Sequence, residues 1–328
     1  MMNNEAAIPE TLEYVTENET EPVVVQQHRL SSIMPIVVFS YIGVLIRLGL
    51  AFLGNNQVPM NAAFWPNFVG CFIMGFVVEQ KIHIQNHFSQ LYIGLTTGLC
   101  GSITTFSGLM YNSCVALFGP SNDLTYPISN FLTVLIAALS ASFVGFTVGR
   151  HISAFLLPPS PELTKRVRYF NSHVRIWLFP ILTLLSIPLL ILLAVLLPVS
   201  KYTYFIYSVI FAPFGSLTRY ALSVLFNFNP NFPLGTLIAN ILGSYIYFGM
   251  VAINQYVYSL SPLSKHVVTS VIQGYSGCLT TISTFILELD TIKKRKYVYL
   301  YFTMSVLLVQ LVFVILGDLF SFICSPVS

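Results

Sequence analysis

The chain has 328 residues, of which 55% are hydrophobic and only 8% are charged, and its formal net charge is +3. Soluble domains carry about 25% charged residues, so this composition excludes an ordinary soluble protein and indicates a membrane protein. The five cysteines form no C-x-x-C pair and no cluster with histidine, which argues against a disulfide framework and a zinc site.

The N-terminal residues 1–32 are polar and acidic, with six glutamates before Pro22. They lack the basic segment of a cleavable signal peptide, so we predict a disordered tail followed by a retained first span. A membrane-spanning helix needs about 20 mostly apolar residues. By this criterion the chain is an all-α membrane protein with nine predicted spans, at residues 33–53, 62–79, 91–116, 130–157, 176–197, 204–226, 233–253, 265–289 and 297–323.

Lysine and arginine are distributed unequally between the loops that join these spans. Eleven of the 15 lie in the tail and in alternate loops on one side, whereas only Lys201 and Lys265 lie in the loops on the other side. Loops on the cytosolic side carry the excess of basic residues. We therefore predict a plasma-membrane protein with a cytosolic N-terminus and an outside C-terminus.

A charged, proline-rich segment at 158–175 separates two halves of the chain, as expected for a loop between domains. The span that follows, 176–197, has few polar residues and resembles no other span. We predict two four-helix units, 33–157 and 204–328, joined by a cytosolic loop and this linker span at 158–203.

Three motifs of the first half recur in the second half in the same order, which indicates an internal duplication. The single linker span reverses the second half, so the two copies are predicted to be antiparallel, as an inverted repeat. The matched stretches are "GVLIRLG" with "GSLTRYA", which pairs Arg47 with Arg219; "NFVGCFIMG" with "NILGSYIYFG", which pairs Asn67 with Asn240; and "GLCGSITTFSGL" with "GYSGCLTTISTF".

The third motif carries two adjacent threonines in each copy, Thr104 and Thr105 in the first and Thr280 and Thr281 in the second. The G-x-x-G spacing before them is typical of close helix packing. Threonine also satisfies backbone groups that are freed where a membrane helix breaks. We therefore predict a broken third span in each half, with the two breaks crossing at the middle of the membrane.

Two further pairs of polar residues lie inside predicted spans. Asn67 and Asn240 serve either as interhelical hydrogen-bond partners or as donors that face a pore. Arg47 and Arg219 either extend to the membrane interface or form an electropositive vestibule for an anion. No acidic residue lies centrally in any predicted span, which argues against a cation or proton pathway.

Together these motifs resemble those of the bacterial CrcB (Fluc) fluoride channels, and two copies joined by one span resemble the eukaryotic fluoride exporters (FEX). The likeness covers about residues 33–157 and 204–323. It implies passive, selective conduction of fluoride. It also implies a structural sodium ion and no organic cofactor, with the sodium held by the backbone carbonyls of Gly101, Ser102, Gly277 and Cys278.

The resemblance further implies that each pore is lined by two phenylalanines, one from each unit. Phe106 and Phe285 complete one such pair, whereas Ile282 and Leu109 occupy the other without an aromatic ring. We therefore predict one working pore and one vestigial pore. The candidate pore residues are completed by Asn67, Asn240, Thr104, Thr105, Ser107, Thr280, Thr281, Ser283 and Thr284, and the candidate vestibule residues are Arg47 and Arg219.

The predicted function is passive export of fluoride from the cytosol, and the alternative is a proton- or sodium-coupled anion transporter. The predicted partners are fluoride and membrane lipid, with no nucleic acid. The fused halves make a protein partner unnecessary, so a monomer is expected to act as a pseudo-dimer. An enzyme has no support, because every histidine lies at or beyond a span end and none is placed to pair with a buried Glu or Cys.

Overall fold

The computed structural model describes residues 21–54, 62–118, 127–157, 172–196, 200, 203–257 and 260–323. These residues are helical almost throughout, and no strand occurs among them. Seven of the helices are long and apolar enough to cross a membrane. The predicted membrane protein with an all-α fold is therefore confirmed for the described ranges.

The first half consists of α1, α2, a broken third segment and α6. Their bounds are α1 Glu21–Gly54, α2 Phe64–Glu79, α3 Lys81–Ile93, the π-helical η1 Gly94–Cys100, α4 Gly101–Ile103, α5 Phe106–Phe118 and α6 Pro127–Leu156.

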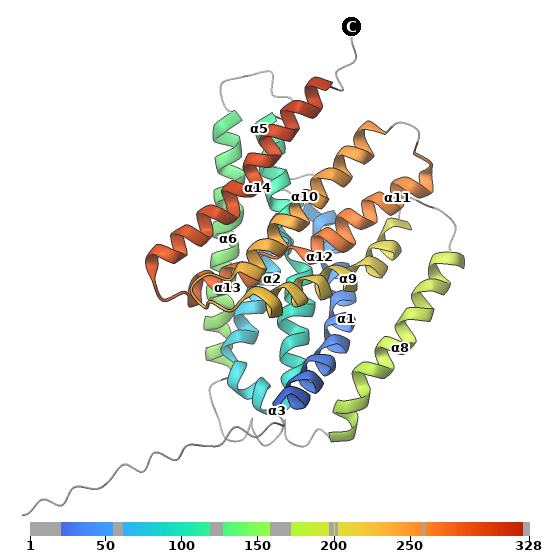
Figure 1. The fold of residues 1–328 in the computed structure, drawn as a ribbon, viewed down its shortest axis with the longest axis vertical. Helices are drawn as coiled ribbons and strands as arrows, with labels where there is room; N and C mark the ends of the chain where they lie inside the picture. The colour runs from blue at the N-terminus through green and yellow to red at the C-terminus, as the bar shows by residue number, and fades with distance from the viewer. Residues whose placement is uncertain are drawn as a thin grey trace, which may run out of the picture.

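The linker helix α8 and the second half follow. Their bounds are α8 Ser172–Leu196, α9 Thr203–Phe226, α10 Leu234–Tyr256, α11 Pro262–Ser270, the π-helical η2 Val271–Ser276, α12 Gly277–Leu279, α13 Ser283–Thr291 and α14 Arg295–Ile323. In Figure 1, α2, α5 and α6 run nearly vertically, whereas α9, α10 and α14 cross them obliquely.

All nine predicted spans coincide with helical segments, but three of them are not single long helices, and the span predicted at 91–116 is divided among α3, η1, α4 and α5. The span predicted at 62–79 is α2, which has 16 residues. The span predicted at 265–289 is divided among α11, η2, α12 and α13. The count of nine crossings consequently stays a prediction.

The N-terminal tail differs in part from the prediction. Helix α1 begins at Glu21, so residues 21–32, which were expected to be disordered, are helical. The apolar span supplies a helical nucleus, and extending an existing helix through residues such as glutamine, arginine and leucine is inexpensive. Residues 1–20 lie outside the described residues, as do 158–171 of the predicted loop.

Helices α2 and α6 approach each other closely because glycines along their contact leave room for the backbone of the partner helix. A Cβ atom on Gly75 would collide with the carbonyl of Phe146, and one on Gly149 would collide with the carbonyl of Phe72. Small residues of this kind let membrane helices pack backbone to backbone. The first half is thereby built around a rigid α2–α6 pair.

Helix α8 lies at the edge of the molecule, where it touches α1 and α9 (Figure 1). Most of its apolar side chains are exposed, such as Leu184 at 74% and Val195 at 75%, as expected for a helix that faces lipid. This position agrees with a spacer that returns the chain to the other side of the membrane.

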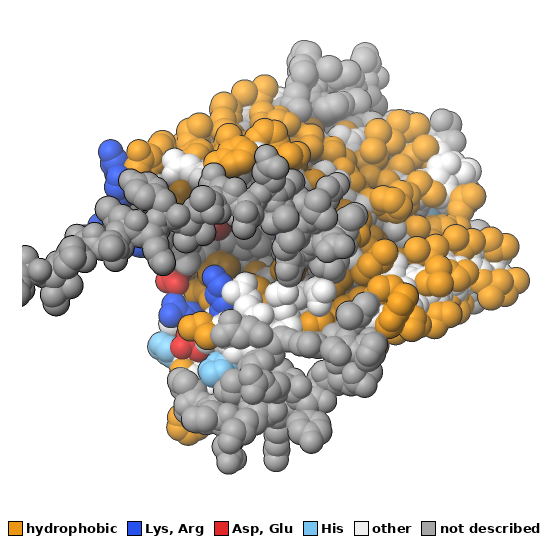
Figure 2. Space-filling model, turned by 60° about the horizontal axis from the view of Figure 1, so that its bottom comes forward, with side chains coloured by type: hydrophobic (Ala, Val, Ile, Leu, Met, Phe, Trp, Pro, Cys, Tyr) orange, Lys and Arg blue, Asp and Glu red, His pale blue; other side chains and the backbone are white. Residues whose placement is uncertain are grey.

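Charged side chains gather in one area of the face shown in Figure 2, while hydrophobic side chains cover the flanks. A group of ion pairs among these charged side chains joins the two halves. Arg150 of α6 pairs with Glu79 of α2 at 3.2 Å and with Asp290 of α13 at 2.9 Å. The C-terminal ends of α2, α6 and α13 therefore meet at one end of the bundle.

Candidate functional site

The third segment of each half is broken at the paired threonines, which confirms the predicted break. Helix α4 ends before Thr104, whose ψ is 153°, and α12 ends before Thr280, whose ψ is 154°. A π-helical segment precedes each break. The last carbonyls of the first segment and the first N–H groups of the next are therefore left without helical partners.

The threonine hydroxyls of one half satisfy N–H groups of the other half. Thr280 Oγ1 accepts a hydrogen bond from the N–H of Ser107 at 3.2 Å. Thr104 Oγ1 accepts from the N–H of Ser283 at 3.2 Å and from that of Ile282 at 3.3 Å. This exchange follows a pseudo-two-fold relation, so the two breaks cross each other as the duplication predicted.

The same hydroxyls also contact other polar groups at the crossing. Thr280 Oγ1 lies 3.0 Å from Ser107 Oγ, and Thr104 Oγ1 lies 3.1 Å from Ser283 Oγ and from Thr281 Oγ1. Each threonine donates to a carbonyl of its own segment, at 3.1 Å in both cases. The predicted pore residues are thus gathered into one buried polar cluster. Of them only Thr284, whose hydroxyl is 3.5 Å from Thr281 Oγ1, is half-buried.

The two asparagines hold the breaks in place. Asn67 Oδ1 accepts from the N–H of Thr105 at 2.8 Å, and its Nδ2 donates to the carbonyl of the same residue at 3.1 Å. Asn240 makes the same two bonds with Thr281, at 2.8 and 3.2 Å. Both side chains are fully buried. The structure therefore shows the interhelical alternative for these residues, and their role at a pore stays a prediction.

Arg47 and Arg219 are buried, with 2% exposure, so neither extends to the membrane interface. Arg47 donates to the carbonyl of Ser102 at 2.8 Å and, in the other half, to the carbonyl of Gln273. Arg219 donates to the carbonyl of Thr97 at 2.8 Å. Each arginine thus reaches into the opposite half, where the C-terminal end of a helical segment favours positive charge. The vestibule assignment stays a prediction.

This arrangement does not fit the predicted set of sodium ligands as a whole. The carbonyl of Ser102 already accepts a hydrogen bond from Arg47. A Cβ atom on Gly101 would meet the guanidinium of Arg219, and one on Gly277 would meet that of Arg47. A sodium ion on these carbonyls would be flanked by two positive charges, which repel it.

The predicted aromatic pair is formed between the halves. The rings of Phe106 and Phe285 have centroids 5.6 Å apart and an interplanar angle of 75°, an edge-to-face arrangement. Both rings are fully buried. Leu109 and Ile282 belong to the same buried cluster and bring only aliphatic carbon to it. The pair Phe106 and Phe285 is therefore aromatic and the matched pair Leu109 and Ile282 is aliphatic.

A second polar cluster, which was not predicted from the sequence, lies beside Phe285. Glu288 is half-buried and accepts hydrogen bonds from Thr236 Oγ1 at 2.6 Å and from Tyr301 Oη at 2.7 Å. The ring of Tyr301 also packs against Phe285, with centroids 5.3 Å apart. Spacing could have identified Glu288, because a residue three positions after Phe285 lies on the same helical face.

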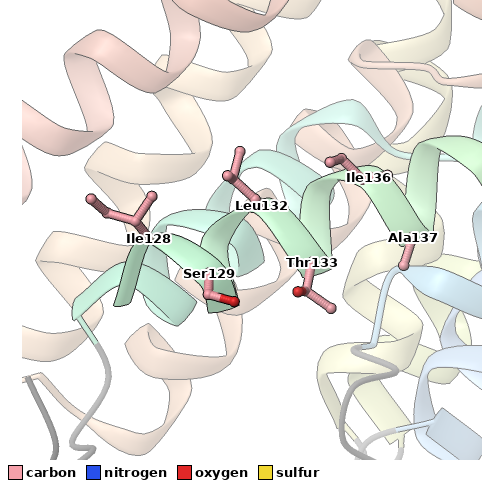
Figure 3. Close-up of a pocket in the computed structure, with 6 residues that line it drawn as sticks. All are labelled: Ile128, Ser129, Leu132, Thr133, Ile136 and Ala137. Carbon is pink, nitrogen blue, oxygen red and sulfur yellow. The ribbon is translucent and has the colours of Figure 1, made fainter. Parts of the chain in front are cut away.

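A shallow pocket on α6 lies apart from these residues (Figure 3). Ile128, Leu132 and Ile136 line it together with Ser129, Thr133 and Ala137. All six side chains are uncharged and come from a single helix. Such a surface offers an anion no compensating charge, so we exclude it from the candidate site.

Comparisons with known proteins agree with the duplication. The sequence model of the family described as CrcB-like protein, Camphor Resistance (CrcB), matches residues 34–146 and again residues 206–318. "Fluoride export protein 1" of Candida albicans is 30% identical over 298 residues, which cover 81% of this chain and 73% of that protein. No solved structure matches the chain at a significant level.

Two further relatives are similar to the chain, one over most of its length and one over about a quarter of it. "Fluoride export protein 1" of Neurospora crassa is 29% identical over 335 residues, which cover 82% of this chain and 63% of the relative, so the match spans a little under two thirds of it. The bacterial "Fluoride-specific ion channel FluC 2" of Staphylococcus haemolyticus is 42% identical over 89 residues, which cover 27% of this chain and 70% of the relative.

Proposed function

The chain belongs to the CrcB family, whose sequence model matches each of its halves in turn, and from this premise we propose that it is a passive, selective fluoride channel that exports fluoride from the cytosol. Its relatives are called fluoride export proteins and fluoride-specific ion channels. They are transport proteins, so the chain is not assigned an enzymatic activity.

The observation that carries the proposal is the crossed pair of broken segments with an edge-to-face phenylalanine pair beside it. The N-terminal ends of α5 and α13 begin at this crossing, and N-terminal helix ends favour a negative charge. An aromatic ring presents a positive edge, so a phenyl group can face a small anion. The crossing thus supplies partial positive charges beside an apolar wall.

A single working pore follows from the asymmetry of the matched positions. The path beside Phe106 and Phe285 has two rings and continues to the hydrogen-bonded group of Thr236, Glu288 and Tyr301. In the first half, Asn112 is matched to Glu288 and Ala63 to Thr236. The second path therefore lacks both rings, which supports treating it as vestigial.

Passive export is sufficient for resistance to fluoride. An inside-negative membrane potential favours the outward movement of an anion by about 2.3 kcal/mol per charge per 100 mV. We place the protein in the plasma membrane with a cytosolic N-terminus. The end of the bundle at which Glu79, Arg150 and Asp290 meet is then the cytosolic end, which agrees with the excess of basic residues in the loops on that side.

The fused halves already provide both members of the crossing, because every cross-half hydrogen bond described above lies within one chain. We therefore propose that a monomer acts as a pseudo-dimer without an obligatory protein partner. Blue-native electrophoresis of an active preparation should give the mass of one chain, and activity confined to a dimer would contradict this part of the proposal.

One observation favours a second candidate, a proton-coupled anion transporter. Glu288 is a half-buried carboxylate beside Phe285, and carboxylates within membrane proteins are typical of proton pathways. The two candidates differ in whether fluoride movement carries net charge.

Efflux from liposomes loaded with potassium fluoride distinguishes them. A channel releases fluoride rapidly only after valinomycin provides a potassium shunt, and it leaves chloride-loaded liposomes closed. Release without valinomycin would show coupled exchange and contradict the channel. Equal release of chloride would contradict the proposed selectivity, and empty liposomes provide the control for leakage.

A further inference from the structure

Four consecutive basic residues lie where α13 turns into α14. Lys293, Lys294, Arg295 and Lys296 follow the end of α13 at Thr291, and all four are exposed. We call these four residues the basic turn. It is the densest run of positive charge in the chain.

The basic turn joins the two helices that border the phenylalanine pair. Phe285 lies on α13, six residues before its last residue, which corresponds to about 9 Å along a helix. Tyr301 lies on α14, and it contacts both the ring of Phe285 and the carboxylate of Glu288. The basic turn therefore stands at the end of the polar path that leads away from Phe285.

The nearby acidic groups do not neutralise the basic turn. Glu79 and Asp290 are both paired with Arg150, at 3.2 and 2.9 Å. Glu288 is directed to Thr236 and Tyr301. Even if all three acids are counted against Arg150 and the basic turn, five positive charges meet three negative ones.

The matched connection of the first half has no positive charge. Residues 119–126, "GPSNDLTY", connect α5 to α6 and contain Asp123 but no lysine or arginine. The duplication therefore placed the basic residues at only one of the two equivalent positions. That position belongs to the helix that carries Phe285 and Glu288.

We propose that the basic turn is a collecting site for fluoride, which concentrates the anion at the mouth of the pore on that face. The inference rests on the proposed function and adds a step to it. A local field of one sign raises the concentration of a small counter-ion and its rate of entry, and this effect weakens as ionic strength rises. The positive-inside rule alone would also place basic residues here, but it predicts no effect on current.

Single-channel recording in planar bilayers of neutral phosphatidylcholine tests the collecting site. In symmetric fluoride at about 10 mM ionic strength, where the Debye length is about 30 Å, the wild type should carry roughly twofold or more current from one side than from the other. The inequality should disappear at about 1 M salt, where the Debye length falls to about 3 Å. Random orientation only changes the sign of the voltage at which the larger current appears.

The variant K293Q/K294Q/R295Q/K296Q should show equal currents in both directions at low ionic strength and should match the wild type at high ionic strength. Lys265→Gln changes an exposed residue at the opposite end of the same half and provides the matched control. It should keep the unequal currents of the wild type. Unchanged thermal stability and fluoride-over-chloride selectivity would show that the variant is intact.

Equal currents of wild type and variant at low ionic strength would overturn the collecting site while leaving the channel in place. A wild type that passes no fluoride current would instead refute the proposed function. An effect that persists at about 1 M salt would also overturn the proposal, because a screened surface charge cannot act over that distance.

Discussion

Replacing Thr280 with valine tests whether the crossing is held by hydroxyl groups of the opposite half. Valine keeps the shape of threonine and removes only the hydroxyl. In the structure this hydroxyl accepts from the N–H of Ser107 at 3.2 Å, donates to the carbonyl of Ser276 at 3.1 Å and contacts Ser107 Oγ at 3.0 Å. The variant leaves a buried N–H at the start of α5 without this acceptor.

An unsatisfied buried donor costs about 1–3 kcal/mol, and polar contacts between membrane helices average about 0.6 kcal/mol. We therefore expect Thr280→Val to lower the free energy of unfolding by about 1–3 kcal/mol. Thr104→Val should lower it at least as much, because Thr104 accepts from two N–H groups. The loss is measured as the shift in denaturation of the purified protein in mixed detergent micelles.

Thr269→Val provides the matched control. Its hydroxyl, on a half-buried side chain, donates to the carbonyl of Lys265 within the same helix, at 2.9 Å, so its loss should change stability by less than about 0.5 kcal/mol. If Thr280→Val and Thr269→Val destabilised the protein equally, the hydroxyls at the crossing would not hold the two halves together.

Two other predictions concern packing and the polar group beside the pore. Gly149→Ala should destabilise the protein by about 1–3 kcal/mol or prevent folding, because the new methyl group meets the backbone of α2. Gly249→Ala has open space around it and should be tolerated. Equal shifts of the denaturation midpoint in the two variants would contradict the close packing of α2 and α6. Tyr301→Phe should lower stability by about 1–3 kcal/mol because Glu288 loses one of its two hydrogen bonds. Tyr299→Phe, at a side chain that is 70% exposed, should change the stability little. If it lowered the denaturation temperature as much as Tyr301→Phe, the hydrogen bond between Tyr301 and Glu288 would not stabilise the protein.

The repeat and the breaks could be predicted because their residues are costly in lipid. Paired threonines and an asparagine inside apolar spans need partners, and two copies in register indicated that the partners lie in matched places. The structure gives those partners, since Asn67 bonds to Thr105 and Asn240 to Thr281. The phenylalanine pair came from the family resemblance, and the ring geometry agrees with it.

Long-range contacts could not be predicted from the sequence. The contact of Arg47 with the carbonyl of Gln273 spans 226 residues and depends on how the two halves dock, so its direction could not be inferred from local pattern. Glu288 lies at the end of the predicted span 265–289, and its partners Thr236 and Tyr301 come from α10 and α14, so the sequence alone did not show that they meet. The helical start at Glu21 was missed because the tail composition alone indicated disorder.

The paired variants Phe285→Ile and Ile282→Ala test whether fluoride follows a single selective path beside Phe106 and Phe285. Both are measured as valinomycin-dependent fluoride efflux from liposomes, with chloride run in parallel. We predict that Phe285→Ile alone loses most of its fluoride release, because only this change removes a ring from the complete pair. Equal loss in both variants would contradict the single path, and unimpaired release by Phe285→Ile would contradict the placement of the pore.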